Sequence, residues 1–122
     1  MGFECLNGFP GPFIKFMAKQ NSPDDIYNLC TSSKKFKATI QCAYALTGGY
    51  LNDEIKVFEG SIDGSVVKPR GATEFICSLG LFFQPAGLNK TYSEMSVEEE
   101  NPTNYHSAAA FEEMKKYLET LY

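Results

Sequence analysis

The residues that could do chemistry in this chain are few: one histidine, four cysteines and two small groups of basic side chains. A lone histidine such as His106 either lies on the surface, where it can cap a helix, or contacts a ligand. The basic groups are Lys34, Lys35 and Lys37, and Lys68 and Arg70. Such groups are usually solvated surface, although either could form a local pocket for an anion.

The cysteines do not have the spacing of a zinc site. They are Cys5, Cys30, Cys42 and Cys77. No C-x-x-C pair is present and no histidine lies nearby in the sequence, so we do not expect zinc binding. Because the sequence also has no signal-peptide segment and no long apolar stretch, we expect a cytoplasmic protein with reduced thiols and no membrane partner.

Common catalytic motifs are absent from the sequence. It contains no G-x-x-x-x-G-K-[ST] or G-x-G-x-x-G phosphate loop, no G-x-S-x-G elbow and no H-E-x-x-H zinc motif. The net charge is −4, so we expect no binding to nucleic acid from the overall electrostatic field. Residue types and spacing alone therefore indicate a globular domain and no particular reaction.

Length and composition predict one folded domain over residues 1–122. Hydrophobic residues make up 43% of the chain and aromatic residues 14%, which excludes a disordered chain. Pro12 is a suitable first residue for a short helix over residues 12–20. Ser22 followed by Pro23 and two aspartates predicts the start of a second helix.

An antiparallel meander is predicted for the middle of the chain. Residues 37–46 alternate with period two, which is typical of a strand with one buried face. Residues 54–59 and 64–67 predict two further strands joined by a turn between glycines. Residues 68–95 are either a long ordered loop or a strand flanked by loops.

A closing amphipathic helix is predicted from about Thr103. Phe111, Met114, Leu118 and Leu121 share one of its faces, and we expect that face to pack on the sheet. Helices, a meander and a final helix together indicate an α+β or mixed α/β fold.

Four segments resemble the inosine triphosphate pyrophosphatase family in order and spacing. They are LNGFPGPFIKF at residues 6–16, VFEGSIDGSVVKPRG at 57–71, FFQPAGLNKTYSEM at 82–95 and YHSAAAF at 105–111. The resemblance implies hydrolysis of ITP, dITP and XTP to the monophosphate and pyrophosphate. It also implies an elongated mixed sheet with two lobes, a purine nucleoside triphosphate between them, and usually a homodimer.

The same resemblance implies Mg²⁺ as cofactor, bridging phosphate oxygens, with carboxylates that hold the metal and activate water. In the family, a Ser/Thr-Gly-Asn-x-x-Lys phosphate grip and an acidic metal ligand precede the segment at residues 6–16. We therefore expect this chain to lack those N-terminal strands and most of those groups. No catalytic residue and no metal ligand is assigned within it.

Three substrate-binding residues follow from the resemblance. Phe75 matches the first residue of the family's base-stacking Phe-Gly-Trp-Asp-Pro segment, whose Trp and Asp have no counterpart here. His106 matches the histidine of the family's Lys-x-x-x-Ser-His-Arg segment, which aligns with residues 101–107. Arg70 could hold either a carboxylate or the nucleotide, because a planar guanidinium suits both.

Three functional hypotheses remain open at this stage. In the first, the chain is a Mg²⁺-dependent nucleoside triphosphate pyrophosphatase. In the second, it is a non-catalytic relative that binds nucleotide or dimerises, for example by pairing with a full-length relative. In the third, it is a partial product of a locus whose complete form is the enzyme.

Overall fold

The computed structural model describes residues 1–71, 78–95 and 108–121. Its elements follow the order β1 (Gly2–Phe3), η1 (Glu4–Leu6), η2 (Gly11–Phe13), α1 (Ile14–Gln20), α2 (Pro23–Ser33), β2 (Lys37–Leu46), η3 (Gly49–Leu51), β3 (Lys56–Val66), η4 (Ser78–Leu81), β4 (Phe83–Pro85), η5 (Tyr92–Glu94) and α3 (Ala108–Glu119), where η marks a 3₁₀ helix. The predicted mixed α/β class is confirmed.

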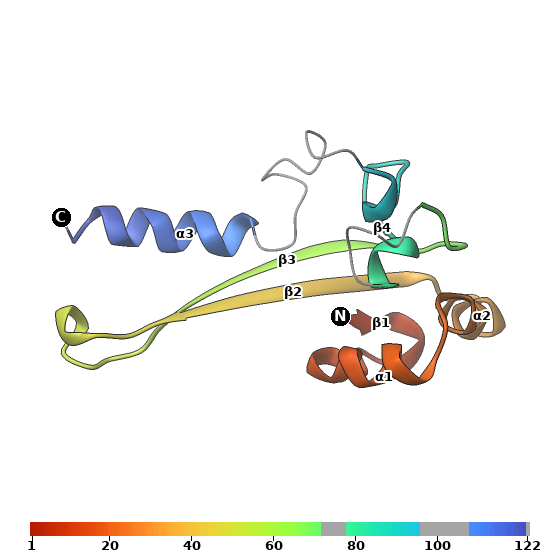
Figure 1. Ribbon diagram of the computed structural model, residues 1–122, viewed down its shortest axis with the longest axis horizontal. Coiled ribbons are helices and arrows are strands. Elements are labelled where there is room, and N and C mark those ends of the chain that lie inside the picture. Colours follow the sequence, from red (N-terminus) through yellow and green to blue (C-terminus); the bar gives the residue numbers. More distant parts are fainter. Residues whose placement is uncertain (72–77, 96–107, 122) are drawn as a thin grey trace.

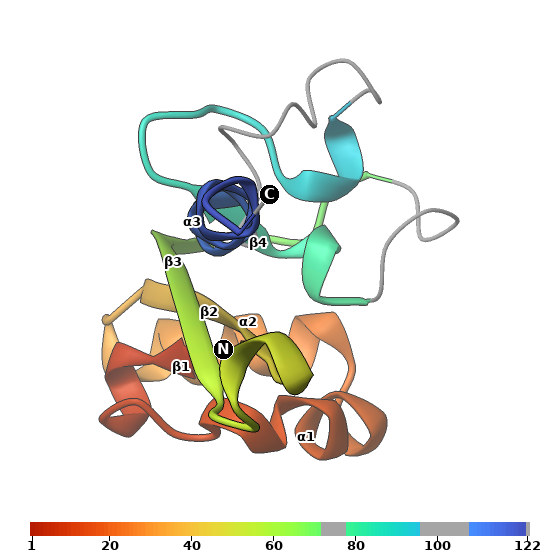
Figure 2. The same ribbon diagram turned by 90° about the vertical axis from the view of Figure 1, so that its left-hand side faces the viewer.

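The described strands form one sheet in the order β1-β2-β3-β4, and every pair is antiparallel. Strands β2 and β3 pair along their whole length, from Lys37 opposite Ser65 to Leu46 opposite Lys56. They form a long ribbon that reaches beyond the body of the molecule (Figure 1). Helices α3 and α1 lie on opposite sides of this ribbon (Figures 1 and 2).

The core lies at the end of the ribbon that carries β1 and β4. Phe3, Phe82 and Phe83 are fully buried there, and α2 adds Ile26 and Cys30. The Phe83 ring packs against Tyr92, with 5.5 Å between ring centroids. Because aromatic side chains bury large apolar areas, this cluster contributes strongly to the hydrophobic stabilisation of the body.

The glycine- and proline-rich segment near the N-terminus links β1 to α1. Gly8 and Gly11 adopt φ values of 92° and 56°, which glycine tolerates without strain, and the Phe9–Pro10 peptide is cis. The Phe3 N–H donates to the Phe9 carbonyl, and the Gly8 N–H donates to the Phe3 carbonyl. The dense turn chemistry therefore folds the chain back beside β1, a strand of two residues that the sequence pattern did not predict.

Helix α2 begins as predicted at Ser22. The Ser22 hydroxyl accepts a hydrogen bond from the Asp25 N–H at 3.2 Å, and the Asp25 carboxylate accepts one from the Ser22 N–H at 2.9 Å. This reciprocal capping box satisfies two backbone donors that the first helical turn leaves free. The shorter α1 begins after η2, so the helix predicted over residues 12–20 is confirmed from Ile14 onward.

The turn predicted between residues 59 and 64 is wrong, because β3 is a single strand across both glycines. A Cβ on Gly60 would lie 2.8 Å from the Ala110 nitrogen, and a Cβ on Gly64 would lie 2.6 Å from the Phe83 ring. Both glycines therefore make room for neighbouring elements and do not reverse the chain. The region after β3 contains β4, which settles the alternative left open there in favour of a strand flanked by loops.

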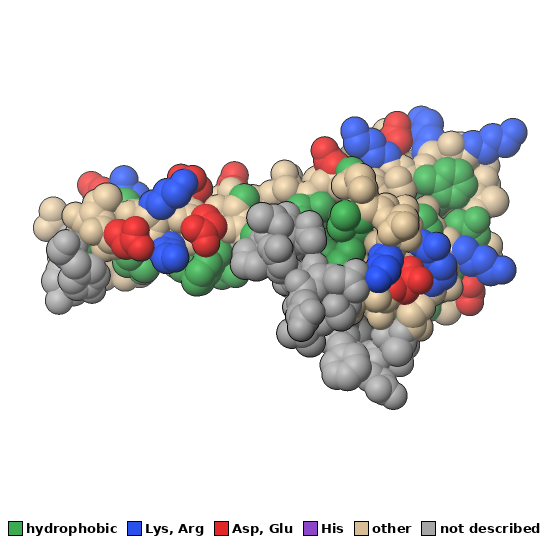
Figure 3. Space-filling view, turned by 90° about the horizontal axis from the view of Figure 1, so that it is seen from above, with side chains coloured by type: hydrophobic (Ala, Val, Ile, Leu, Met, Phe, Trp, Pro, Cys, Tyr) green, Lys and Arg blue, Asp and Glu red, His purple; other side chains and the backbone are tan. Residues whose placement is uncertain are grey.

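Helix α3 packs on the ribbon, as predicted for the closing helix, and Ala110 is its buried residue. The predicted face is only partly covered, because Phe111 and Leu121 stay exposed by 49% and 40%. Tyr44 of β2 meets Phe111 edge-on at 6.3 Å, and Phe58 of β3 lies 5.7 Å from Tyr117. The start of the predicted helix, residues 103–107, lies outside the described residues. Seen from above, the ribbon with α3 forms a narrow arm beside a broader body (Figure 3).

Candidate functional site

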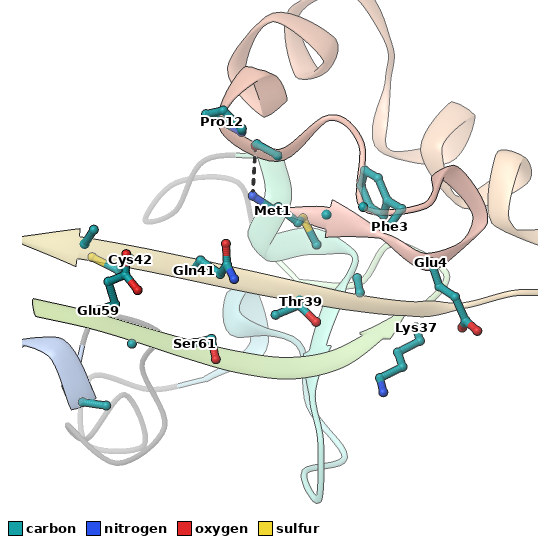
Figure 4. A pocket seen from close by; sticks show the side chains of 17 residues that line it. Met1, Phe3, Glu4, Pro12, Lys37, Thr39, Gln41, Cys42, Glu59 and Ser61 are labelled. Atoms are coloured by element: carbon teal, nitrogen blue, oxygen red, sulfur yellow. Dashed lines mark hydrogen bonds between the residues drawn. The ribbon is translucent and has the colours of Figure 1, made fainter.

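An open groove of about 870 Å³ lies between the N-terminal segment, the ribbon and the first turn of α3. Lys37, Thr39 and Gln41 alternate along β2 and line it together with Ser61 of β3 (Figure 4). Residues two apart on a strand point to the same face, so the period-two pattern of β2 positions these side chains. A volume of this size is within the range of small-molecule sites.

The lining of the groove is rich in hydrogen-bonding groups. Its side chains offer hydroxyls from Thr39 and Ser61 and an amide from Gln41. The Thr39 hydroxyl also donates to the Asp63 carboxylate at 2.7 Å, which fixes its orientation across the two strands. Gly2, Gly8 and Gly11 expose backbone along the opposite wall. Such a surface suits a polar ligand with several donors and acceptors.

Charges of both signs border the groove. Lys37 and the Met1 ammonium are cationic, whereas Glu4 and Glu59 are anionic. The ammonium donates to the Gly11 carbonyl at 3.2 Å, and burial lowers the pKa of this amine below its ordinary value. The mixed charge indicates that the groove does not attract anions as strongly as a wholly basic site would.

The residues that the structure describes do not fit a protein-held metal centre. Among them, no group of three or more His, Cys, Asp or Glu side chains is close enough to hold a metal ion. Mg²⁺ in nucleotide enzymes is usually bound by one or two carboxylates together with waters and the phosphates of the substrate. The described part of the chain therefore shows no metal site built from its own side chains alone.

Arg70 is the one predicted site residue within the described part of the chain, and its guanidinium has protein partners. Its Nη2 donates to the Gln84 side chain, and its Nε lies 3.3 Å from the Glu94 carboxylate. Glu94 also accepts from the Thr91 N–H at 3.0 Å, and the buried Thr91 hydroxyl donates to the Arg70 carbonyl at 3.1 Å. Arg70 thus connects the end of β3 to β4 and η5.

This cluster around Arg70 is separate from the groove, whose lining does not include Arg70. The arginine side chain is still 44% exposed. Phe75 and His106, the other two predicted substrate contacts, lie outside the described residues. The structure therefore does not test whether Arg70, Phe75 and His106 lie close together.

The groove residues Thr39, Gln41 and Ser61 were not anticipated as functional residues, whereas Lys37 belongs to a basic group for which a local anion pocket was left open. The sequence does contain a signal for them, because polar side chains alternate with buried ones along β2. That alternation is equally typical of a solvated sheet face, so the pattern alone could not mark a site. The two-residue strand β1 and the folded-back turn, which enclose the groove, were needed to reveal it.

The sequence of the chain matches the Ham1 family over residues 1–117. It is 34% identical over 120 residues to the inosine triphosphate pyrophosphatase of Schizosaccharomyces pombe, covering 98% of this chain and 62% of that protein. The inosine triphosphate pyrophosphatase of Yarrowia lipolytica is 30% identical over 97% of this chain and 61% of its own length. The chain thus spans somewhat less than two thirds of these relatives.

The fold is similar to that of the Ham1 protein from Staphylococcus aureus, with a TM-score of 0.77 at 23% sequence identity. That comparison covers 98% of this chain and 62% of the solved structure. None of the described helices is both long enough and apolar enough to cross a bilayer.

Proposed function

The chain belongs to the Ham1 family, and from this premise we propose that it acts in the hydrolysis of inosine triphosphate to the monophosphate and pyrophosphate. The observation that carries the proposal is its 34% identity, over 98% of its length, to a protein named inosine triphosphate pyrophosphatase. The related nucleotides dITP and XTP, implied by the same resemblance, are the other proposed substrates.

We assign part of the nucleotide to the groove. Thr39, Gln41 and Ser61 offer hydroxyl and amide groups that suit ribose and phosphate oxygens, and Lys37 adds a cation at the border. His106 is only three positions before Ala109, which lines the groove at α3. This proximity along the chain supports a contact between His106 and the nucleotide at that end.

Phe75 and Arg70 complete the proposed substrate contacts. Phe75 would stack on the purine, as the family resemblance implies for this position. Arg70 has five N–H donors, of which Gln84 and Glu94 occupy two, so the exposed remainder could still reach a phosphate oxygen. Its side-chain contacts with Gln84 of β4 and Glu94 of η5 would then orient that contact.

Magnesium is the cofactor that the family resemblance implies, and it supplies charge neutralisation at the phosphates when bound. Because the described residues do not form a ligand cluster, we derive no step through the metal. We also assign no general base among the described residues. What these residues can do is bind and orient the polar parts of a nucleotide.

We further propose that the protein is cytoplasmic and works as a homodimer or by pairing with a full-length relative. Exposed aromatic side chains near the N-terminus support self-association.

Pyrophosphate release is the test of this function. With Mg²⁺ present, we expect the purified chain to release pyrophosphate from ITP, dITP and XTP faster than from GTP. Failure to release pyrophosphate by a folded protein that still binds ITP in calorimetry would overturn the catalytic proposal and leave nucleotide binding. Failure of both would overturn the assignment of a nucleotide site.

Ser61→Ala and Ser65→Ala form a matched pair for locating the nucleotide. Both serines lie on the same face of β3, but only Ser61 lines the groove. We expect Ser61→Ala to weaken ITP binding about 3- to 10-fold, as the loss of one neutral hydrogen bond does, and Ser65→Ala to leave it unchanged. Equal affinities for the two variants would place the nucleotide elsewhere.

A further inference from the structure

Cys5 and Cys30 face each other at the junction of η1 and α2. Their sulfur atoms are 3.8 Å apart, although 25 positions separate them in the sequence. Cys30 is fully buried in the core, whereas Cys5 is partly exposed. The third described thiol, Cys42, is a free thiol on β2.

The separation is too long for a disulfide and is that of two thiols in contact. A disulfide needs about 2.05 Å between sulfur atoms, so oxidation requires the two sulfur atoms to move closer by roughly 1.8 Å. η1 is a single short turn at the surface, which can adjust more easily than the core around α2. The two thiols are therefore in contact but not bonded, which is the arrangement expected of a reduced pair that can form a disulfide.

We propose that Cys5 and Cys30 form a reversible disulfide when the protein meets a peroxide. Hydrogen peroxide first oxidises the accessible Cys5 thiol to a sulfenic acid and releases one water. The Cys30 sulfur then attacks the Cys5 sulfur, so that the S–S bond forms, the S–O bond breaks and a second water leaves. Both cysteines are oxidised and the peroxide is fully reduced to water.

The order of these steps follows from the surroundings of the two sulfur atoms. Burial, and secondly the Cys5 thiol, raise the pKa of Cys30 to about 12, so Cys30 is a neutral thiol near pH 7. A buried neutral thiol reacts slowly with peroxide in solution. Cys30 is therefore the resolving cysteine, and the partly exposed Cys5 is the one oxidised first.

The disulfide would tie the wall of the groove to the core. Phe3 and Glu4, next to Cys5 in the chain, line that groove, and α2 is packed into the body. A bond between residues 5 and 30 would also close the loop that contains the folded-back turn, η2 and α1. Oxidation is therefore expected to restrict movement of the segment that encloses the groove.

Peptide mapping after oxidation tests the pair. The folded chain is treated with hydrogen peroxide, its free thiols are alkylated under denaturing conditions, and the digest is analysed by mass spectrometry. We expect a peptide linked through Cys5 and Cys30 as the main oxidised product, and we expect dithiothreitol to restore both thiols. The readout does not depend on nucleotide hydrolysis, so it stands apart from the proposed function.

Single variants supply the controls. Cys42→Ser should keep the linked peptide, whereas Cys5→Ser should abolish it and leave Cys30 alkylated. Circular dichroism of Cys5→Ser shows whether that variant is folded, and the wild-type map tests the proposal independently of it. The proposal is overturned when peroxide links Cys5 or Cys30 to Cys42 or Cys77 instead, or oxidises those cysteines while Cys5 and Cys30 stay unlinked.

Discussion

Two glycines of β3 determine how closely other elements approach the ribbon. The Cα of Gly60 faces the first turn of α3, and that of Gly64 faces Phe83 of β4. Any larger residue at either position would push its neighbour away, because the interior is packed without free space. At the scale of single residues, α3 and β4 can therefore approach β3 closely because Gly60 and Gly64 have no side chain.

Gly64→Ala is expected to destabilise the protein. The added methyl group would overlap the Phe83 ring, which is fully buried, so strain should lower the free energy of unfolding by about 1–3 kcal/mol. Chemical denaturation measures this loss. Gly49→Ala is the matched control, since a Cβ there has no atom within 4 Å and should change stability by less than about 0.5 kcal/mol. Equal stabilities would contradict the packing argument.

At the scale of elements, α2 depends on its first turn. Its N-terminus has a complete capping box and Asp24 beside Asp25, both of which favour a helix N-terminus. The helix in turn carries Ile26 and Cys30 into the core. A weakened cap should therefore lower the stability of the body of the protein as well as that of the helix.

Ser22→Ala removes one side of this cap. The Asp25 N–H would lose its acceptor, so we expect the free energy of unfolding to fall by about 1 kcal/mol. Thermal denaturation followed by far-ultraviolet circular dichroism provides the measurement. Ser32→Ala is a control on the same helix, because its hydroxyl bonds only to the Asn28 carbonyl within the helix. A loss of similar size in both variants would show that the cap has no special part in stability.

The same cap predicts how acid affects stability. The hydrogen bond from the Ser22 backbone, followed by that from its side chain, lowers the pKa of Asp25 below its unfolded value of 3.8. The stabilisation is then fully present above that unfolded pKa and is lost as the pH falls through the lower folded pKa. Denaturation of wild type and Asp25→Asn from pH 7 to pH 2 should show their difference shrinking at the acid end. A difference that stays constant would exclude this origin.

The elements could be predicted from the sequence where local chemistry decides them. Ser22 and Pro23 mark the start of α2 through bonds within four residues, and the alternation of residues 37–46 matches β2 at both ends. The turn predicted near Gly60 was wrong because its glycines serve contacts with α3 and β4, which lie far away in the sequence. The groove was missed for a similar reason, since its opposite wall comes from the N-terminal segment. Long-range contacts of this kind leave no local pattern.

At the scale of the whole molecule, the body and the ribbon arm leave apolar side chains in contact with water. Phe9, Phe13 and Phe16 are exposed by 60%, 59% and 62% on the N-terminal segment. Phe13 and Phe16 are three residues apart across η2 and α1, so they face a similar direction. Three exposed phenylalanines so close in sequence favour an interface over random surface exposure.

The homodimer proposal predicts that Phe16→Ser shifts the protein toward the monomer. Removing a ring that would be buried at the interface costs association free energy of about 1–3 kcal/mol, a change of roughly 5- to 150-fold in the dissociation constant. Size-exclusion chromatography with light scattering, run over a dilution series, measures that constant. Ile55→Ser is the control, because Ile55 is 69% exposed and directly precedes Lys56, where the pairing of β2 and β3 ends. Figure 1 shows that this end of the ribbon lies away from α1. The dissociation constant of the Ile55→Ser dimer should equal that of the wild type. If Ile55→Ser dissociates and Phe16→Ser stays dimeric, the interface lies on the arm. A wild-type protein that is monomeric at every concentration would contradict the dimer proposal.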